Sequence, residues 1–182
     1  MHWTSLTILG LALAAGSASA APEPPASRAA ERAASPAAAR ADAIRAAAAR
    51  LPSVRGRRHD ATGDTSWRAS FDGEELTMIE ESVPDAPRAP LRNRYYFEHG
   101  VLFYVSGEQA AATASGATGP APRVPVVAEF QGARPVSAVR IEHYGEVKLE
   151  PARIAAIQQR AAELANAARA ARAARTAPKV AP

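Results

Sequence analysis

The chain has 182 residues, carries a formal net charge of +4 and contains no cysteine. Its length accommodates one domain of ordinary size with tails. The lack of cysteine excludes disulfides, thiolate metal sites and cysteine nucleophiles, so packing alone must stabilise the fold.

The charge is divided unevenly along the chain. Residues 21–58 carry eight arginines and three acids, residues 59–150 eight bases and fourteen acids, and residues 151–182 six bases and one acid. The basic ends either contact an anionic surface, such as lipid, lipopolysaccharide or wall polymer, or interact with the acidic middle of the same chain. A further explanation is compositional bias from a GC-rich genome, since 20 arginines stand against two lysines.

The first 20 residues have the pattern of a secretory signal peptide. An apolar run from Leu6 to Ala15 is followed by small residues that end in Ala18-Ser19-Ala20, which is an A-x-A cleavage pattern. The run is shorter than a membrane-spanning helix, which needs about 20 residues. We therefore expect cleavage after Ala20 and a periplasmic or secreted mature chain without a transmembrane segment.

An alanine-rich helix is expected before the domain. Residues 21–34 have the composition of a disordered leader. Ser35-Pro36 then has the pattern of an N-cap followed by proline at the first helical position, and Pro52 limits the helix. Because only Ile44 and Leu51 offer apolar bulk, this helix either docks weakly or is a solvated spacer. It and a basic linker make up residues 35–58.

From Thr65 onward the apolar residues recur with a period of two, which is typical of strands. Hairpins are expected around Asp72-Gly73, around Glu98-His99-Gly100 and around Gln131-Gly132. Three prolines predict a loop over residues 83–91, and a run of small residues predicts another over residues 107–122.

A C-terminal amphipathic helix is expected from Pro151, because apolar residues recur at spacings of three and four: Ile154, Ile157, Ala161, Leu164 and Ala168. The sequence therefore predicts an α+β domain over residues 59–168. It is an antiparallel β-meander of five or six strands, in three hairpins, with this helix on one face. Residues 169–182 are expected to form an Arg/Ala-rich tail in which the helix projects or frays.

The central hairpin, residues 94–106, holds five of the ten aromatic residues of the chain. Pairing Phe97 with Val101 across a three-residue loop divides its side chains between two sides. One side holds Tyr95, Phe97, Val101, Phe103 and Val105, and we expect the C-terminal helix to cover it. The other side holds Arg94, Tyr96, Leu102 and Tyr104. Tyrosine and arginine are enriched at binding hot spots, so this second side is a candidate partner-binding face. The alternatives are that the N-terminal helix covers it, or that the tyrosines lie over the sheet with solvated hydroxyls.

One resemblance accompanies this hairpin. The run Tyr-Tyr-Phe-x-x-Gly-x-Leu-x-Tyr at residues 95–104, behind a signal peptide and ahead of a terminal helix, resembles small uncharacterised bacterial envelope proteins. It is also similar to MORN-type hairpin repeats, whose second glycine and regular period are missing here. The resemblance covers about residues 65–165 and implies no function.

No motif indicates a chemical reaction. There is no Gly-x-Ser-x-Gly elbow and no phosphate-cradling glycine loop, so an enzyme, a cofactor and a metal are not expected. His59, with nearby aspartates, lies in a polar linker that does not fix metal-ligand spacing. A hydrolase would need His99 and His143 to meet beside a carboxylate. The paired acids Glu74-Glu75 and Glu80-Glu81 are expected to be edge and solubility charges.

These observations predict an exported, non-catalytic binding or interaction module of the bacterial envelope. Its partner would be an envelope protein or a second copy of the chain, bound through Arg94, Tyr96, Leu102 and Tyr104. The alternative is tethering to an anionic envelope surface through Arg169, Arg172 and Arg175. Nucleic acid is not an expected partner, because the domain is acidic and the chain is exported.

Overall fold

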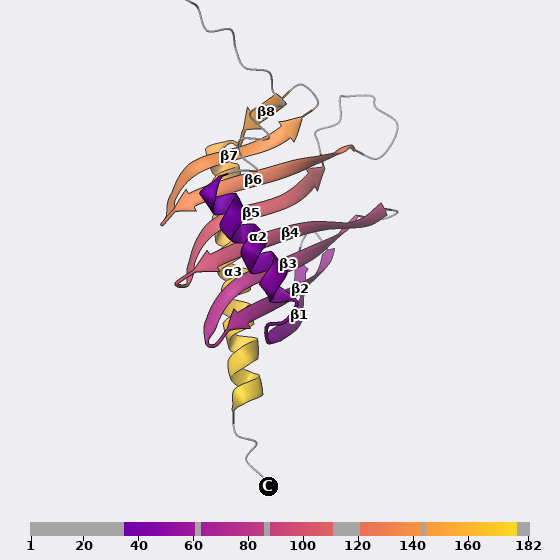
Figure 1. Cartoon of the computed structure of the whole chain (residues 1–182). Helices are drawn as coiled ribbons and strands as arrows, with labels where there is room; N and C mark the ends of the chain where they lie inside the picture. The colour runs from indigo at the N-terminus through magenta and orange to yellow at the C-terminus, as the bar shows by residue number, and fades with distance from the viewer. Residues whose placement is uncertain (1–34, 61–62, 86–87, 111–120, 143–144, 178–182) are drawn as a thin grey trace, which may run out of the picture.

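A computed structural model describes residues 35–60, 63–85, 88–110, 121–142 and 145–177. Eight strands form one antiparallel sheet in which each strand pairs with its neighbours in sequence (Figure 1). The strands are β1 (Ser53–Asp60), β2 (Gly63–Asp72), β3 (Glu75–Asp85), β4 (Arg88–Glu98), β5 (Val101–Ala110), β6 (Arg123–Gln131), β7 (Arg134–Glu142) and β8 (Gly145–Lys148). The expected signal peptide and leader lie outside the described residues.

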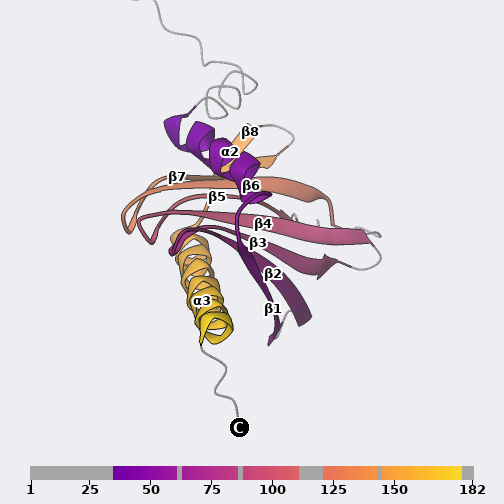
Figure 2. The ribbon, with the colours of Figure 1, turned by 60° about the horizontal axis from the view of Figure 1, so that its bottom comes forward.

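Two helices lie on opposite faces of the sheet. The helix α2 (Pro36–Ala48) lies on one face and α3 (Pro151–Thr176) on the other (Figure 2). The chain is therefore α+β, as predicted, and the sheet is not closed. Its curvature brings the first strands around α3 (Figure 2).

The prediction of five or six strands is wrong, because the sheet has eight. The two additional strands are its edges. Strand β1 occupies the segment expected to be a basic linker, and β8 begins where a turn was expected. An edge strand needs only one ladder of hydrogen bonds, and polar side chains protect its free edge. Val54 is the one buried residue of β1 within its described side chains, so β1 lacks the apolar alternation by which a strand is recognised.

The predicted loops are also shorter than expected. Strands β3 and β4 extend through most of residues 83–91, and Val83 pairs with Leu91. Pro84 lies at an irregularity between Val83 and Asp85, where the lack of an N–H group is tolerated. Strand β5 likewise continues to Ala110. The hairpins therefore have longer arms than the turn residues alone indicate.

The main core lies between the sheet and α3. The predicted stripe is confirmed at Ala161, Leu164 and Ala168, which are buried, while Ile154 and Ile157 are half-buried. These residues pack on large side chains of the sheet, including Trp67, Phe71, Ile79, Tyr95, Phe97 and Phe130. Burial of each large side chain contributes about 1.5–3 kcal/mol.

A smaller core lies between the sheet and α2. Ser35 caps the helix by accepting a hydrogen bond from the Ala38 amide at 3.0 Å, and its hydroxyl donates to Glu129 at 2.7 Å. Three alanines on one side of the helix are buried against the sheet: Ala38, Ala41 and Ala48. Because alanine is small, the helix approaches the sheet closely. Of the two alternatives left by the sequence, α2 therefore docks.

Candidate functional site

The aromatic hairpin turns through two residues. Glu98 pairs with Val101, and the turn residues His99 and Gly100 have φ angles of 51° and 76°. Positive φ at both positions matches the type I′ turn, whose twist fits that of the flanking strands. The predicted three-residue loop and its pairing of Phe97 with Val101 are therefore wrong.

A β-bulge next to this turn changes which side chains share a face. Tyr96 pairs with Tyr104 and Phe97 with Leu102, so Phe103 is the additional residue. Phe103 joins Tyr96 and Tyr104 on the α2 side, while Leu102 packs with the α3-side core. The predicted sides are therefore wrong for Phe103 and for Leu102.

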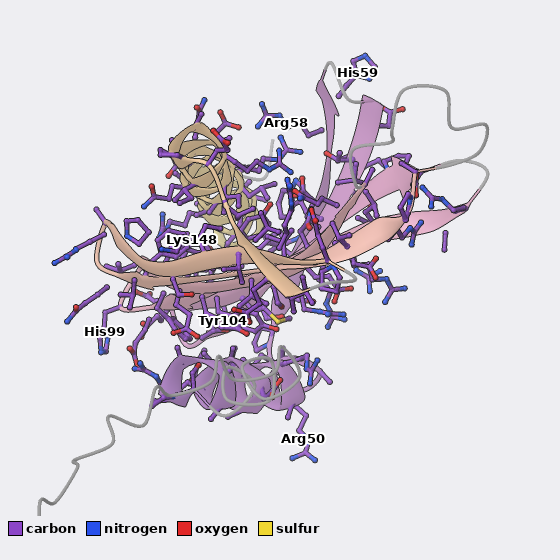
Figure 3. The ribbon with its side chains drawn as sticks, turned by 90° about the horizontal axis from the view of Figure 1, so that it is seen from above. Arg50, Arg58, His59, His99, Tyr104 and Lys148 are labelled. Carbon is purple, nitrogen blue, oxygen red and sulfur yellow. The ribbon has the colours of Figure 1, made fainter. Side chains whose placement is uncertain are left out.

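The tyrosines of the expected partner face are covered by α2. Tyr96 is 2% exposed and Tyr104 is 9% exposed, and Tyr104 lies between the sheet and the helix (Figure 3). Arg94 lies beside them, half-buried, and its Nε donates to Glu80 at 2.9 Å. A partner could reach the two tyrosines only after α2 had left the sheet.

This burial predicts sensitivity to alkali. Desolvation, followed by the charge of Glu129, raises the pKa of Tyr104 to about 12, whereas an unfolded tyrosine titrates near about 10. The folded state favours the neutral phenol, so its stabilising contribution is complete below pH 10 and is lost as the pH rises to about 12. We expect the melting temperature to fall in this window, and less steeply in Tyr104→Phe. If the tyrosinate absorbance of Tyr104 in the folded protein appeared at the ordinary pKa of tyrosine, the prediction would be contradicted.

Two of the three arginines of the expected tail are engaged with the sheet. Arg172 lies over the Phe71 ring, with Cζ 4.5 Å from the ring centroid, and Arg175 Nη1 donates to the Ser53 carbonyl at 3.2 Å. Arg169 is exposed. The helix continues to Thr176, so of the two alternatives left by the sequence it does not fray within residues 169–176. Tethering through this segment would therefore depend on Arg169 and on Arg175, which is also exposed but already donates to the Ser53 carbonyl, while Arg172 is half-buried.

The described histidines are exposed and far apart. His59 and His99 lie at opposite ends of the sheet (Figure 3), and His59 Nδ1 is 2.8 Å from Asp64 Oδ1. No group of three histidines or acids that could hold a metal ion occurs among the described residues. His143 lies outside them, so the hydrolase hypothesis stays a prediction.

Arginines form two rows across strands β1–β4, on the same face as α2. The strand register places Arg55, Arg68, Glu80 and Arg94 in one row and Arg57, Ser66, Ser82 and Arg92 in the next. Residues that pair across strands share a face of the sheet. The two rows thus combine five arginines with a single glutamate.

Three adjoining hollows connect these rows with the C-terminal end of α2. They have volumes of about 580, 180 and 580 Å³ and share Arg68, Glu80, Arg45 and Arg94 where they meet. We call this surface the arginine groove and define it by Arg45, Arg55, Arg57, Arg68, Arg92 and Arg94. It lies beside α2, which covers the neighbouring tyrosines.

Three of the six arginines of the groove lack a polar partner among the described residues. Arg94 pairs with Glu80, Arg45 with Asp42 at 2.9 Å, and Arg68 Nε donates to Ser53 at 3.2 Å. Arg55, Arg57 and Arg92 are exposed and form no hydrogen bond or ion pair within the described part of the chain. Guanidinium groups bind carboxylate and phosphate through two parallel hydrogen bonds. The groove therefore presents three guanidinium groups that are available to an anion.

A second polar cluster lies on the α3 face. Glu81, expected to be a surface charge, is 1% exposed. Its Oε1 accepts hydrogen bonds from Arg160 Nε at 2.8 Å and Nη2 at 2.5 Å, and its Oε2 accepts one from the Tyr95 hydroxyl at 2.9 Å. Burial and this carboxylate raise the pKa of Tyr95 well above its usual value. Sequence reasoning missed the cluster. The available signal was the strand period of two, because Glu81 follows the buried Ile79 by two residues and so lies on the same face of β3.

Comparison with known proteins gives no relative. No protein-family model, no curated protein and no solved structure matches the chain. Among the helices of the described residues, none combines the length and the apolar character needed to span a membrane.

Proposed function

We propose that this chain is an exported, non-catalytic binding module of the bacterial envelope, and that its arginine groove binds a linear anionic polymer. The observation that supports this most strongly is the set of exposed guanidinium groups of Arg55, Arg57 and Arg92, which have no partner in the part of the chain that the structure describes. Export is supported by the signal-peptide pattern of residues 1–20.

A polymer fits this groove better than a single small anion. Neighbouring strands lie about 4.8 Å apart, so the rows extend roughly 15 Å from β1 to β4. A chain that carries a phosphate or carboxylate on each repeat can contact several guanidinium groups at once. Each contact releases bound counterions, which makes the affinity depend on salt. The serines between the arginines, Ser66 and Ser82, add hydroxyl donors to the same surface.

The groove is also a better candidate than the C-terminal helix for the anion contact predicted from the sequence. Arg172 and Arg175 already contact Phe71 and Ser53. In the groove, three arginines are free of such contacts among the described residues.

The experiment is a calorimetric titration with linear polyphosphate of the protein and of the variant Arg55→Gln, Arg57→Gln, Arg92→Gln. Each arginine near an anionic surface contributes about 1 kcal/mol, so the variant should bind about a hundredfold more weakly. The slope of log affinity against log salt should fall by about 2. A parallel titration with polygalacturonate, a carboxylate polymer, shows whether the groove prefers phosphate or carboxylate groups.

The matched control replaces three exposed arginines outside the groove, Arg50→Gln, Arg134→Gln and Arg169→Gln, and has the same net charge. Its affinity should stay within a few fold of that of the unmodified protein. Equal loss in both variants would show that net charge alone decides binding and would overturn the proposal. Binding to phosphatidylglycerol vesicles without binding to either polymer would overturn it in favour of a lipid surface.

A further inference from the structure

A cavity of about 260 Å³ lies between α3 and strands β3–β6, on the sheet face opposite the arginine groove. Small residues leave this space open: Ala156 on the helix and Gly107 on β5. The Asn93 side chain lies over Gly107, where a Cβ atom would overlap with its amide oxygen. Glycine at this position therefore lets the Asn93 amide lie against β5 at the cavity wall.

One wall of the cavity is the buried Glu81 cluster. Both carboxylate oxygens of Glu81 are occupied by hydrogen bonds, from Arg160 and from Tyr95, and the Arg160 charge balances that of Glu81. Arg160 also donates to Thr65 at 3.1 Å. A side chain held by several hydrogen bonds keeps one position, so this wall is preorganised and close to neutral.

Three polar side chains of the lining have no such partners. Asn93 and Gln109 are half-buried and Arg153 is exposed, in the first turn of α3. Within the described residues, their side chains form no hydrogen bond or ion pair. Between them lie the apolar side chains of Val105, Val126 and Ile157. The cavity thus combines an apolar interior with two unpaired amides and one unpaired cation.

We propose that this cavity binds a small monocarboxylate with a compact apolar body. Arg153 pairs with the carboxylate, and the amides of Asn93 and Gln109 donate to its oxygens. The valines and Ile157 contact the apolar body. A cavity of about 150 Å³ holds benzene, so 260 Å³ accommodates one ring with a carboxylate. A cation is disfavoured, because both acids of the lining are already paired, Glu81 with Arg160 and Glu108 with Arg123 at 3.5 Å.

The test uses benzoate, with neutral benzamide and cationic benzylamine as probes of the same size, in amide NMR titrations of the protein. Benzoate should shift the resonances of Asn93, Gly107, Gln109 and Ile157, with a higher affinity than benzamide, and benzylamine should shift none of them. Arg153→Gln should weaken benzoate binding about tenfold, as expected for one charge-assisted ion pair, and leave benzamide binding unchanged. Ala156→Leu, at an exposed helix position, should fill the mouth and abolish both without lowering the melting temperature.

Each contrary result has a defined meaning. No shift at the cavity residues with any probe, up to the solubility limit, overturns the site. Benzylamine binding tighter than benzoate overturns the anionic ligand class. Benzoate shifts confined to Arg55, Arg57 and Arg92 place the anion in the arginine groove and overturn the inference. The triple groove variant should bind benzoate unchanged, so the cavity and the proposed function are tested separately.

Discussion

Replacing Glu81 with alanine is expected to lower the free energy of unfolding by about 3–5 kcal/mol, the range for removing one partner of a buried ion pair. The substitution leaves the Arg160 guanidinium, whose side chain is 19% exposed, without its main counter-charge. It also removes the acceptor of the buried Tyr95 hydroxyl. Glu163, at 4.0 Å from Arg160 Nη1, offers a partial replacement, so we expect the lower end of this range. Urea denaturation monitored by circular dichroism measures the change.

Two control variants show whether the loss comes from burial. The triple variant Glu81→Leu, Tyr95→Phe, Arg160→Leu removes both charges together with the hydroxyl from which Glu81 accepts a hydrogen bond. It should be close to neutral, because well-packed apolar residues often replace buried ion pairs without loss. Glu80→Ala changes the neighbouring carboxylate, which faces the arginine groove and pairs with Arg94 near the surface. It should cost less than about 1 kcal/mol. Equal losses for Glu80→Ala and Glu81→Ala would contradict the burial of the Glu81 cluster.

Replacing Tyr96 with alanine is expected to cost about 3–5 kcal/mol, as for other buried aromatic residues. Tyr96 is 2% exposed, and its ring centroid lies 6.4 Å from that of Phe103 and 5.8 Å from that of Tyr104. Its removal opens a cavity directly under α2. The alanines of the helix cannot fill this cavity, so the helix should also become easier to detach. The melting temperature and the hydrogen exchange of α2 amides report the two effects.

The control for Tyr96 is Tyr96→Phe, which keeps the ring and should lose much less stability than the alanine variant. Tyr96→Ala with an unchanged melting temperature and weakened capture of an envelope partner would contradict the structural role. It would restore the partner-binding face predicted from the sequence. Arg40→Gln is a useful third variant, because Arg40 pairs with Glu98 at 2.6 Å and lies over Phe103. This substitution should weaken α2 docking, measured as faster hydrogen exchange of the α2 amides, without changing the sheet.

The parts of the fold that could be predicted from sequence are those in which local and tertiary preferences agree. Six strands show alternating apolar residues, and three glycine turns join them in pairs. Ser35-Pro36 marks the start of α2, and Pro151 with the stripe through Leu164 marks α3. In each case one face of the element is apolar and has a partner to bury it. The order of the strands follows, because adjacent hairpins need only short connections.

The parts that could not be predicted depend on tertiary contacts. Strand β1 has little apolar alternation and forms because β2 offers it a ladder of hydrogen bonds. The bulge at Phe103 cannot be derived from a period of two, and it exchanges the faces of Phe103 and Leu102. Burial of Glu81 depends on Arg160, 79 residues later in the chain. The arginine groove was missed for the same reason, since strands β1, β2 and β4 each contribute only one or two of its cations.

The position of α3 has a consequence for the order in which the chain folds. Every strand pairs only with neighbours in sequence, so each hairpin closes a short loop at little entropic cost. The core on the α3 face instead joins Val54, Trp67 and Phe71 to Ala161, Leu164 and Ala168, almost the whole length of the domain apart. Hairpins can therefore assemble while the chain emerges, but the core closes only when the last helix arrives. For an exported chain, as we propose, this order delays compact folding until the C-terminus is synthesised, and so favours passage through the membrane in an unfolded state.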